Sequence, residues 1–273
     1  MSTGLVPERP PQVTDLLSRI RFAELQGLRG LFPAGANVLE IGGGNGFQAA
    51  CLAAWGFSVS SVDTGPSDWE MQHYPVIPYD GTRLPFRDGV FDVIFSSNVL
   101  EHVICLRRLL AEARRVMHAG GRAIHVLPTS AWRVWTSIAH YPWLAEYLLF
   151  GRRGGHGRPL PAPSDVLQRR GIWGAMQRAL VPSAHGVDAS SLREIITFGR
   201  QRWLREFEEC GFIVERDWPM GLFYTGYSAG QGLDLRLRQA LATVCGSACR
   251  AYLLKAAERG ASALVGASGG AAA

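Results

Sequence analysis

The stretch Asn37-Val38-Leu39-Glu40-Ile41-Gly42-Gly43-Gly44-Asn45-Gly46 decides the fold. Residues 38–41 are apolar apart from Glu40 and predict a buried strand. Glycines follow at once, and the alanine-rich run 47–55 predicts a helix. A strand, a glycine turn and a helix form the first unit of a nucleotide-binding α/β sheet, because glycine lets a ligand lie against the backbone without a Cβ in the way.

Two classes of ligand use such a turn. A dinucleotide turn has the pattern G-x-G-x-x-G; here Gly42 and Gly44 fit, but Phe47 stands at the third glycine position. The pattern present is E-x-G-x-G-x-G, from Glu40 to Gly46. It resembles motif I of the class I S-adenosylmethionine (SAM)-dependent methyltransferases, and this resemblance implies that the glycines pass under the amino-acid end of the cofactor. Taken alone, the stretch also fits a tight turn that binds no ligand.

Composition predicts an α/β domain with a full core. The chain has 273 residues, of which 47% are hydrophobic and 19% charged, so one domain with insertions is the simplest arrangement. Prolines interrupt residues 7–11 and no run of 18 uncharged apolar residues occurs, so we expect neither a signal peptide nor a spanning helix. The five cysteines are scattered, which favours reduced thiols in a cytoplasmic protein.

The chain is basic, with a formal net charge of +5 and a pI of about 9.2. Lys255 is the only lysine, so an arginine-rich composition is one explanation. Attraction to nucleic acid, phospholipid or phosphorylated sugars is the other. The basic residues are dispersed and no RNA-binding module is recognisable, so we expect no nucleic-acid partner.

Acidic residues follow the next two predicted strands. Asp63 ends the strand 57–62, where it could accept hydrogen bonds from ribose hydroxyls or cap the following turn. A short third strand, 76–79, precedes D-G-x-x-L-P-F-x-D-x-x-F-D-V-I-F-S, which begins at Asp80. This string resembles the segment between strands three and four in methyltransferases of the Methyltransf_11 type. The resemblance implies that Asp80, next to Gly81, hydrogen-bonds the adenine amino group.

A fourth strand, 91–96, leads into the string S-S-N-V-L-E-H-V. It resembles the motif that follows strand four in the same family. The resemblance implies that the backbone lies along the cofactor and that a helix start presents Asn98 and His102 toward the reacting sulfonium. The apolar spacing continues this helix to residue 116, and we expect Gly120-Gly121 to end it before a fifth strand at 122–127.

Residues 129–190 form an insertion. An aromatic-rich apolar run, 132–150, is followed by a basic glycine-rich segment and a second helical run at 166–180. One interpretation is a helical cap packed on the sheet. The other is a face that rests on a membrane and admits a lipid-linked substrate, since interfacial Trp and Tyr beside arginines are typical of such surfaces.

The C-terminal part completes the sheet. A capping-box spacing from Ser191 to Glu194 predicts a helix that continues through Phe207. Strand six follows at 212–218, and residues 248–254 predict a last, antiparallel strand. We therefore expect a single domain over 1–273, with a SAM-binding core at 37–127, a cap at 129–190, the rest of the sheet at 191–255 and a disordered tail at 262–273.

Methyl transfer from a sulfonium is an in-line displacement that mainly needs the nucleophile to be positioned. A general base is needed only for a poorly acidic hydroxyl or a protonated amine. His102 is the first candidate by position, with Glu101, His185 and His156 behind it. His102 could instead pack against the cofactor. No metal cluster is visible in the sequence, so we expect no metal.

These patterns predict an α/β, Rossmann-like, doubly wound sheet of seven strands, mostly parallel with the last strand antiparallel, in the order 3-2-1-4-5-7-6 that the resemblance implies. The expected activity moves a methyl group from SAM to a small-molecule, sugar or lipid-linked acceptor, in the cytoplasm or at the inner membrane surface. The expected cofactor-binding residues are Glu40, Gly42, Gly43, Gly44, Gly46, Asp63, Asp80, Gly81 and Asn98.

Three other functions are weighed against this one. A SAM-binding partner protein without catalysis is compatible with the same motifs. An NAD-dependent oxidoreductase is opposed by Phe47 and by the lack of a Tyr-x-x-x-Lys pair, since Ala251 precedes Lys255 at that spacing. An RNA methyltransferase would need a basic groove or an added module, and the sequence shows neither.

Overall fold

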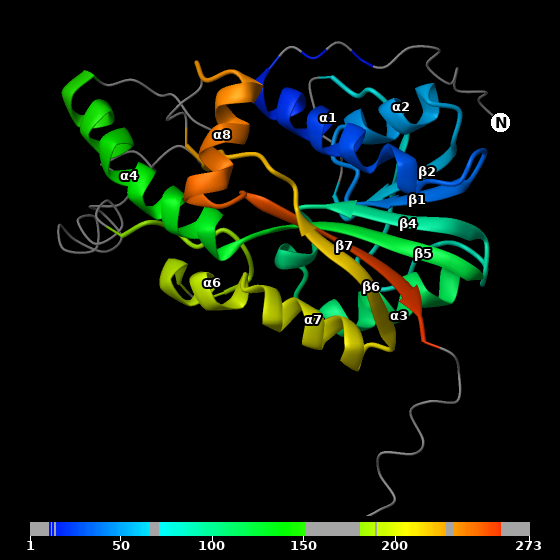
Figure 1. The fold of residues 1–273 in the computed structure, drawn as a ribbon. Helices are drawn as coiled ribbons and strands as arrows, with labels where there is room; N and C mark the ends of the chain where they lie inside the picture. Colours follow the sequence, from blue (N-terminus) through cyan, green and yellow to red (C-terminus); the bar gives the residue numbers. More distant parts are fainter. Residues whose placement is uncertain are drawn as a thin grey trace, which may run out of the picture.

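The computed structural model describes residues 11, 13, 15–65, 71–150, 181–188, 190–227 and 232–257. Within them, seven strands form one sheet in the order β3-β2-β1-β4-β5-β7-β6 (Figure 1). The strands are β1 Asn37–Ile41, β2 Ser58–Asp63, β3 Val76–Pro78, β4 Phe91–Ser97, β5 Met117–Pro128, β6 Phe212–Pro219 and β7 Cys249–Ala256. The first five are parallel to one another, while β7 is antiparallel to both β5 and β6. The predicted doubly wound sheet and its order are confirmed.

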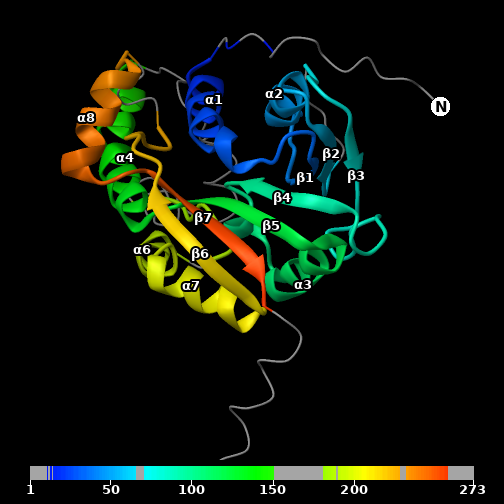
Figure 2. The same ribbon diagram turned by 45° about the vertical axis from the view of Figure 1, so that its right-hand side comes forward.

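Helices cover both faces of this sheet. They are α1 Leu16–Leu28, α2 Phe47–Ala54, α3 Leu106–Val116, α4 Ser130–Phe150, α6 Ser191–Thr197, α7 Arg200–Glu209 and α8 Leu235–Cys245. Helices α1 and α2 lie on one face, and α3, α6 and α7 lie on the other (Figure 1). Helices α4 and α8 lie side by side beyond one end of the sheet (Figure 2), where Trp135 Nε1 donates to the carbonyl of Cys245 at 2.8 Å.

Successive residues of the central strands enter two different cores. Val38 and Phe95 pack on the side of α1 and α2. Leu39 and Ile94 pack on the side of α3 and α7. All four side chains are fully buried. A parallel strand covered by helices on both faces is apolar at nearly every position, which explains why the decisive stretch shows an apolar run and not an alternation.

The expectation that Gly120-Gly121 ends a helix is wrong. Helix α3 ends at Val116 and β5 begins directly at Met117. A Cβ on Gly121 would lie 3.0 Å from the carbonyl oxygen of Asp92 on the neighbouring strand. The pairing between β4 and β5 is irregular at this point. Gly121 therefore permits a close approach of two strands.

Two further predicted helices differ from the structure. After β4 the chain forms a short 3-10 turn, Leu100–His102, and the α-helix begins only at Leu106. The helix expected to run from 190 to Phe207 is split into α6 and α7 at residues 198–199. Its N-cap is Ser190, whose side chain accepts from the Arg193 amide at 3.3 Å.

The insertion is described only in part. It begins with α4, and Ser130 Oγ donates from that helix to the carbonyl of Ile195 on α6 at 2.5 Å. The predicted helical run 166–180, His156 and the tail 262–273 lie outside the described residues. Among the helices that the structure describes, none has the length and apolar character needed to cross a membrane.

His125 is a buried titratable group in the middle of β5. Its Nδ1 lies 2.8 Å from Ser96 Oγ, and its ring stacks on Phe207 at a centroid distance of 5.6 Å. Burial lowers the pKa of His125 from 6.5 to about 3. The unfolded chain therefore binds a proton that the folded chain excludes, and stability falls as the pH decreases from 6.5 toward 3.

Replacing His125 with Gln should remove this dependence, because glutamine can still hydrogen-bond Ser96 but does not titrate. When the pH is lowered from about 7.5 to about 5.5, the free energy of unfolding should decrease in both proteins. We expect this decrease to be about 1.4 kcal/mol smaller in the variant than in the parent. Urea denaturation at the two pH values measures this. His118→Gln, at an exposed position on the same strand, is the matched control. Equal losses in the parent and His125→Gln would contradict the assignment.

Candidate active site

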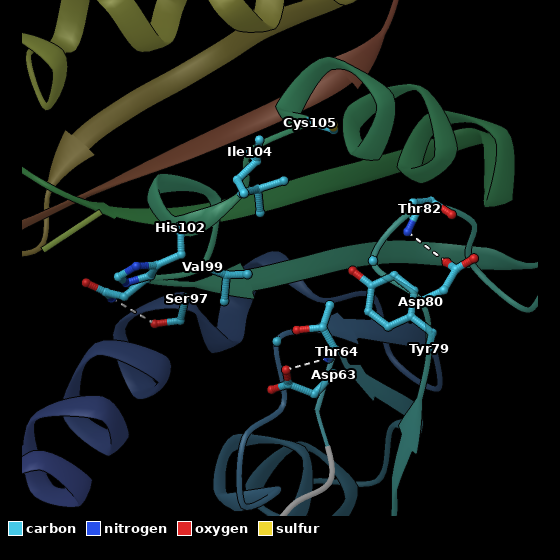
Figure 3. A pocket seen from close by; sticks show the side chains of 14 residues that line it. Asp63, Thr64, Tyr79, Asp80, Thr82, Ser97, Val99, His102, Ile104 and Cys105 are labelled. Carbon is cyan, nitrogen blue, oxygen red and sulfur yellow. Dashed lines mark hydrogen bonds between the residues drawn. The ribbon is translucent and has the colours of Figure 1, made fainter. Parts of the chain in front are cut away.

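A cavity of about 560 Å³ lies at the carboxyl ends of the central strands (Figure 3). This volume is within the range of small-molecule sites. Its lining comes from Gly42, residues 63–64, residues 79–82, residues 97–99 and residues 102–105. Segments that are distant in sequence thus meet at the edge of the sheet where ligands bind in open α/β folds.

The glycine turn after β1 is built for close approach. The amides of Gly42 and Gly43 both donate to the carbonyl of Val62, at 2.8 and 3.1 Å. Gly42 has a φ of 78°, and a Cβ there would lie 2.2 Å from Val99 Cγ2. A side chain at this position is excluded both by the backbone conformation and by the loop that follows β4.

Asp63 is hydrogen-bonded to this turn, and Glu40 is buried close to it. Asp63 Oδ2 accepts from the amide of Gly44 at 2.8 Å, which joins the end of β2 to the turn. Glu40 is buried beneath the turn and accepts from Ser61 Oγ at 2.6 Å. Burial raises the pKa of Glu40 to about 7. Asp63 lines the cavity, whereas Glu40 is buried and does not line it.

Asp80 is an exposed residue on the cavity wall that shapes its own loop. Its Oδ1 accepts from the amides of Thr82 and Arg83 at 2.8 and 2.9 Å (Figure 3). Hydrogen bonds from Arg83 and Thr82 lower the pKa of Asp80 to about 2. The carboxylate is therefore ionised and held in place before any ligand binds.

Asn98 joins the loop after β4 to the N-terminal helix. It has a φ of 55°, in the left-handed region. When the Asn98 side-chain amide is oriented with its oxygen toward Arg21 of α1, this oxygen accepts a hydrogen bond from Arg21 Nη1 at 2.6 Å. The same Nη1 donates to Glu24 at 2.8 Å and to the Tyr224 hydroxyl at 3.1 Å. Helix α1 is thus anchored at the edge of the cavity by buried polar contacts.

The structure brings together part of the predicted set. The cavity is lined by Gly42, Asp63, Asp80, Gly81, Asn98 and His102. Glu40, Gly43, Gly44 and Gly46 do not line it. Sequence reasoning missed Tyr79 and the apolar wall formed by Val99, Val103 and Ile104. These residues stand directly beside the recognised motifs in the sequence, and this position is the one feature from which they could have been predicted.

A second group lies beside the cavity, centred on Glu101. Its side chain is fully buried, and neither carboxylate oxygen has a hydrogen-bond partner in the described part of the chain. Oε1 lies 3.8 Å from His102 Nε2 and 4.0 Å from His185 Nε2. Burial raises the pKa of Glu101 to about 8.

Backbone hydrogen bonds hold His185 next to Glu101. It belongs to segment 181–188, near the end of the insertion. The amides of His185 and Gly186 both donate to Glu194 Oε1 at 2.6 Å, and the amide of Val187 donates to the carbonyl of Glu101 at 3.1 Å. Burial lowers the pKa of His185, and the neighbouring cationic groups add to this effect; burial also lowers the pKa of His102. Both imidazoles are therefore neutral at physiological pH.

Parts of the chain are similar in sequence to known methyltransferases. Residues 39–125 match the family model described as "Methyltransferase domain". An uncharacterized methyltransferase of Mycobacterium sp. (strain JLS) is 42% identical over 99 residues, covering 34% of this chain and 38% of that protein. An uncharacterized methyltransferase of Mycobacterium marinum (strain ATCC BAA-535 / M) is 32% identical over 144 residues, covering 47% and 54%. The matches thus span about half or less of these relatives' length.

A solved structure shares the fold. Geranyl diphosphate C-methyltransferase from Streptomyces coelicolor A3(2), solved with Mg²⁺, geranyl diphosphate and S-adenosyl-L-homocysteine, superposes with a TM-score of 0.50 at 13% identity. The superposition covers 88% of this chain and 80% of that one. At this identity the likeness shows the Rossmann-like fold alone.

Gly186 should be essential for the position of segment 181–188. A Cβ at Gly186 would lie 2.4 Å from the carbonyl oxygen of Glu101, so Gly186→Ala must push the segment away. We expect the amides of His185 and Gly186 to exchange with deuterium at least about tenfold faster, because their bonds to Glu194 loosen. Gly30→Ala, where a Cβ meets nothing within 4 Å, is the control. Unchanged exchange in Gly186→Ala would show that the contact is not tight.

Proposed function

Because the chain belongs to the class I SAM-dependent methyltransferases, with SAM as their cofactor, we propose that it transfers a methyl group from SAM to a small-molecule, sugar or lipid-linked acceptor. One observation carries the proposal. A single cavity holds acidic residues toward one end, at Asp63 and Asp80, and His102 at the other (Figure 3). This arrangement offers hydrogen-bond acceptors for a nucleoside and, separately, a neutral imidazole for an acceptor.

The cofactor residues follow from the same arrangement. In this proposal Asp80 accepts from the adenine amino group and Asp63 accepts from the ribose hydroxyls, since an ionised carboxylate can only accept. The amino-acid end lies over the start of the glycine turn at Gly42, which lines the cavity and has no Cβ to intervene. Asn98, which lines the cavity from the loop after β4, would lie near the methyl group.

The reaction is an in-line displacement. The acceptor atom attacks the methyl carbon, the carbon–sulfur bond breaks, and its electron pair stays on sulfur to give S-adenosylhomocysteine. Positioning supplies most of the rate acceleration. Where the acceptor is a hydroxyl or a protonated amine, His102 is the first candidate to take its proton, because it is neutral and lines the cavity. Glu101 and His185, which lie next to His102, are the second candidates.

The acceptor side is formed by the insertion. Helix α4 carries exposed apolar side chains, with Ile138 and Tyr141 each about half exposed. Such residues fit a peripheral contact with a membrane surface, through which a lipid-linked acceptor could enter. The neighbouring arginine-rich composition fits an anionic surface.

Isothermal titration calorimetry tests the cofactor assignment. We expect SAM or S-adenosylhomocysteine to bind with a micromolar dissociation constant and NAD not to bind. Asp63→Ala should weaken SAM binding about 10- to 100-fold, because two charge-assisted hydrogen bonds to the ribose are lost. Asp88→Ala is the control, since Asp88 is an exposed carboxylate that pairs with Arg115 outside the cavity. Unchanged SAM affinity in Asp63→Ala would remove the ribose assignment.

Vesicle flotation tests the membrane contact. With vesicles that contain anionic phospholipid, we expect the protein to float, and the double variant Ile138→Ser with Tyr141→Ser to remain at the bottom, because apolar burial drives the insertion of such a face. The control is Ile213→Ser on edge strand β6, an exposed residue of the same type outside α4. Equal flotation of parent and double variant would assign the contact elsewhere, and no flotation of the parent would contradict it.

A further inference from the structure

Three metal-ligating side chains from two distant segments meet beside the cavity. One ligand atom each from Glu101, His102 and His185 lies within 4.8 Å of the other two. The distances of 3.8 and 4.0 Å from Glu101 Oε1 to the imidazole nitrogens are too long for hydrogen bonds. Ligands of a tetrahedral site with bonds of about 2.1 Å stand roughly 3.4 Å apart. The three atoms therefore need to move inward by only about half an ångström to share one cation.

The carboxylate of Glu101 shows independently that a partner is missing here. It is 2% exposed, and both of its oxygens lack a hydrogen-bond partner among the described residues. Burying a carboxyl group without a hydrogen-bond partner is costly whether it is protonated or ionised. A bound cation would compensate for this burial directly.

The nearby guanidinium does not fill that role. Arg21 directs its Nη1 to Glu24, Tyr224 and Asn98, and its Nη2 to Asn98. Arg133, on the other side, pairs with Glu194 at 3.2 Å. Both arginines are thus engaged by other partners, and Glu101 faces the two imidazoles.

We propose that Glu101, His102 and His185 bind a divalent cation of the zinc class. Two imidazoles and one carboxylate form the ligand set of a three-ligand zinc site, which leaves a fourth position open. Two nitrogen donors favour Zn²⁺ or Co²⁺ over Mg²⁺, which prefers oxygen ligands. The imidazoles are 43% and 39% exposed, so a cation can enter from solvent.

The ligands are held before the cation arrives. His185 is fixed through the bonds of its own amide and that of Gly186 to Glu194. The ring of Trp132 packs against the imidazole of His185 at a centroid distance of 4.7 Å. Support of this kind sets the orientation of ligands in metal sites.

The open position would take the oxygen of a hydroxyl acceptor, and this part rests on the proposed function. His102 lines the cavity, so the cation faces the place of the methyl donor. Coordination lowers the pKa of a bound hydroxyl. Its proton leaves to water, the oxygen attacks the methyl carbon, and the carbon–sulfur bond breaks with its electron pair retained by sulfur. The cation then replaces His102 as the group that activates the acceptor.

Metal titration of the untagged 273-residue chain tests the site. After treatment with a chelator and its removal, Zn²⁺ is titrated by calorimetry and Co²⁺ by its visible absorption. We expect one equivalent to bind with at least micromolar affinity. Glu101→Gln, which keeps the size of the side chain, and His185→Ala should each weaken binding by about 100-fold or more. The matched control, His118→Ala, removes an exposed histidine at the start of β5 and should bind as the parent does.

The outcomes separate this proposal from the methyltransferase assignment. The metal site is overturned if the parent binds the metal no more tightly than Glu101→Gln does. It is also overturned if His118→Ala loses metal binding. Circular dichroism of each variant shows that it is folded, and Glu101→Gln and His185→Ala test the site through different ligands. SAM titration of the metal-free protein is read separately. SAM binding without Co²⁺ binding removes the metal site alone, and Co²⁺ binding without SAM binding removes the proposed function alone.

Discussion

Parallel pairing of the first five strands is the constraint on which the site depends. It brings the carboxyl ends of β1, β2, β3 and β4 to one edge of the sheet. Each short loop that leaves this edge contributes one wall, from Gly42 through Asp63 and Asp80 to Asn98. The close fit of Gly42 against Val99 then fixes the distance between two of these loops. The arrangement of the cavity walls is thus a consequence of sheet topology.

The proposed acceptor side is held by a different kind of interaction, the buried pair of Arg133 and Glu194. Their side chains are 2% and 0% exposed. Such a pair costs desolvation free energy, which is offset only when other hydrogen bonds complete it. Here Glu194 also accepts two backbone amides of segment 181–188, and Arg133 also donates to the carbonyl of Ser183. The pair therefore joins α4, α6 and that segment into one unit next to the cavity.

This contrast explains what could be predicted from the sequence. The strands and the cavity residues Asp63, Asp80 and His102 follow from local apolar runs and from motifs read along the chain. Glu194 was predicted as a capping-box residue, but its long-range partner determines its place. Gly121 was predicted to end a helix, whereas it permits two strands to approach. In both cases the local pattern is real, and a tertiary contact outweighs it. His185 was named only as a secondary candidate, because nothing local shows that Glu194 brings it to Glu101.

The proposed metal ligands come from both inside and outside the part of the chain that matches the methyltransferase family model. The family match covers residues 39–125, which include Glu101 and His102 but not His185. Two of the three proposed ligands therefore stand on the part shared with known methyltransferases, and the third comes from a segment outside it. A cation bound there would cross-link segment 181–188 to the 3-10 turn at the cofactor cavity. Its binding free energy would then stabilise the closed arrangement of cofactor side and acceptor side, because ligands from both must be in place at once. The same ion would act on the chemistry and on the assembly of the site.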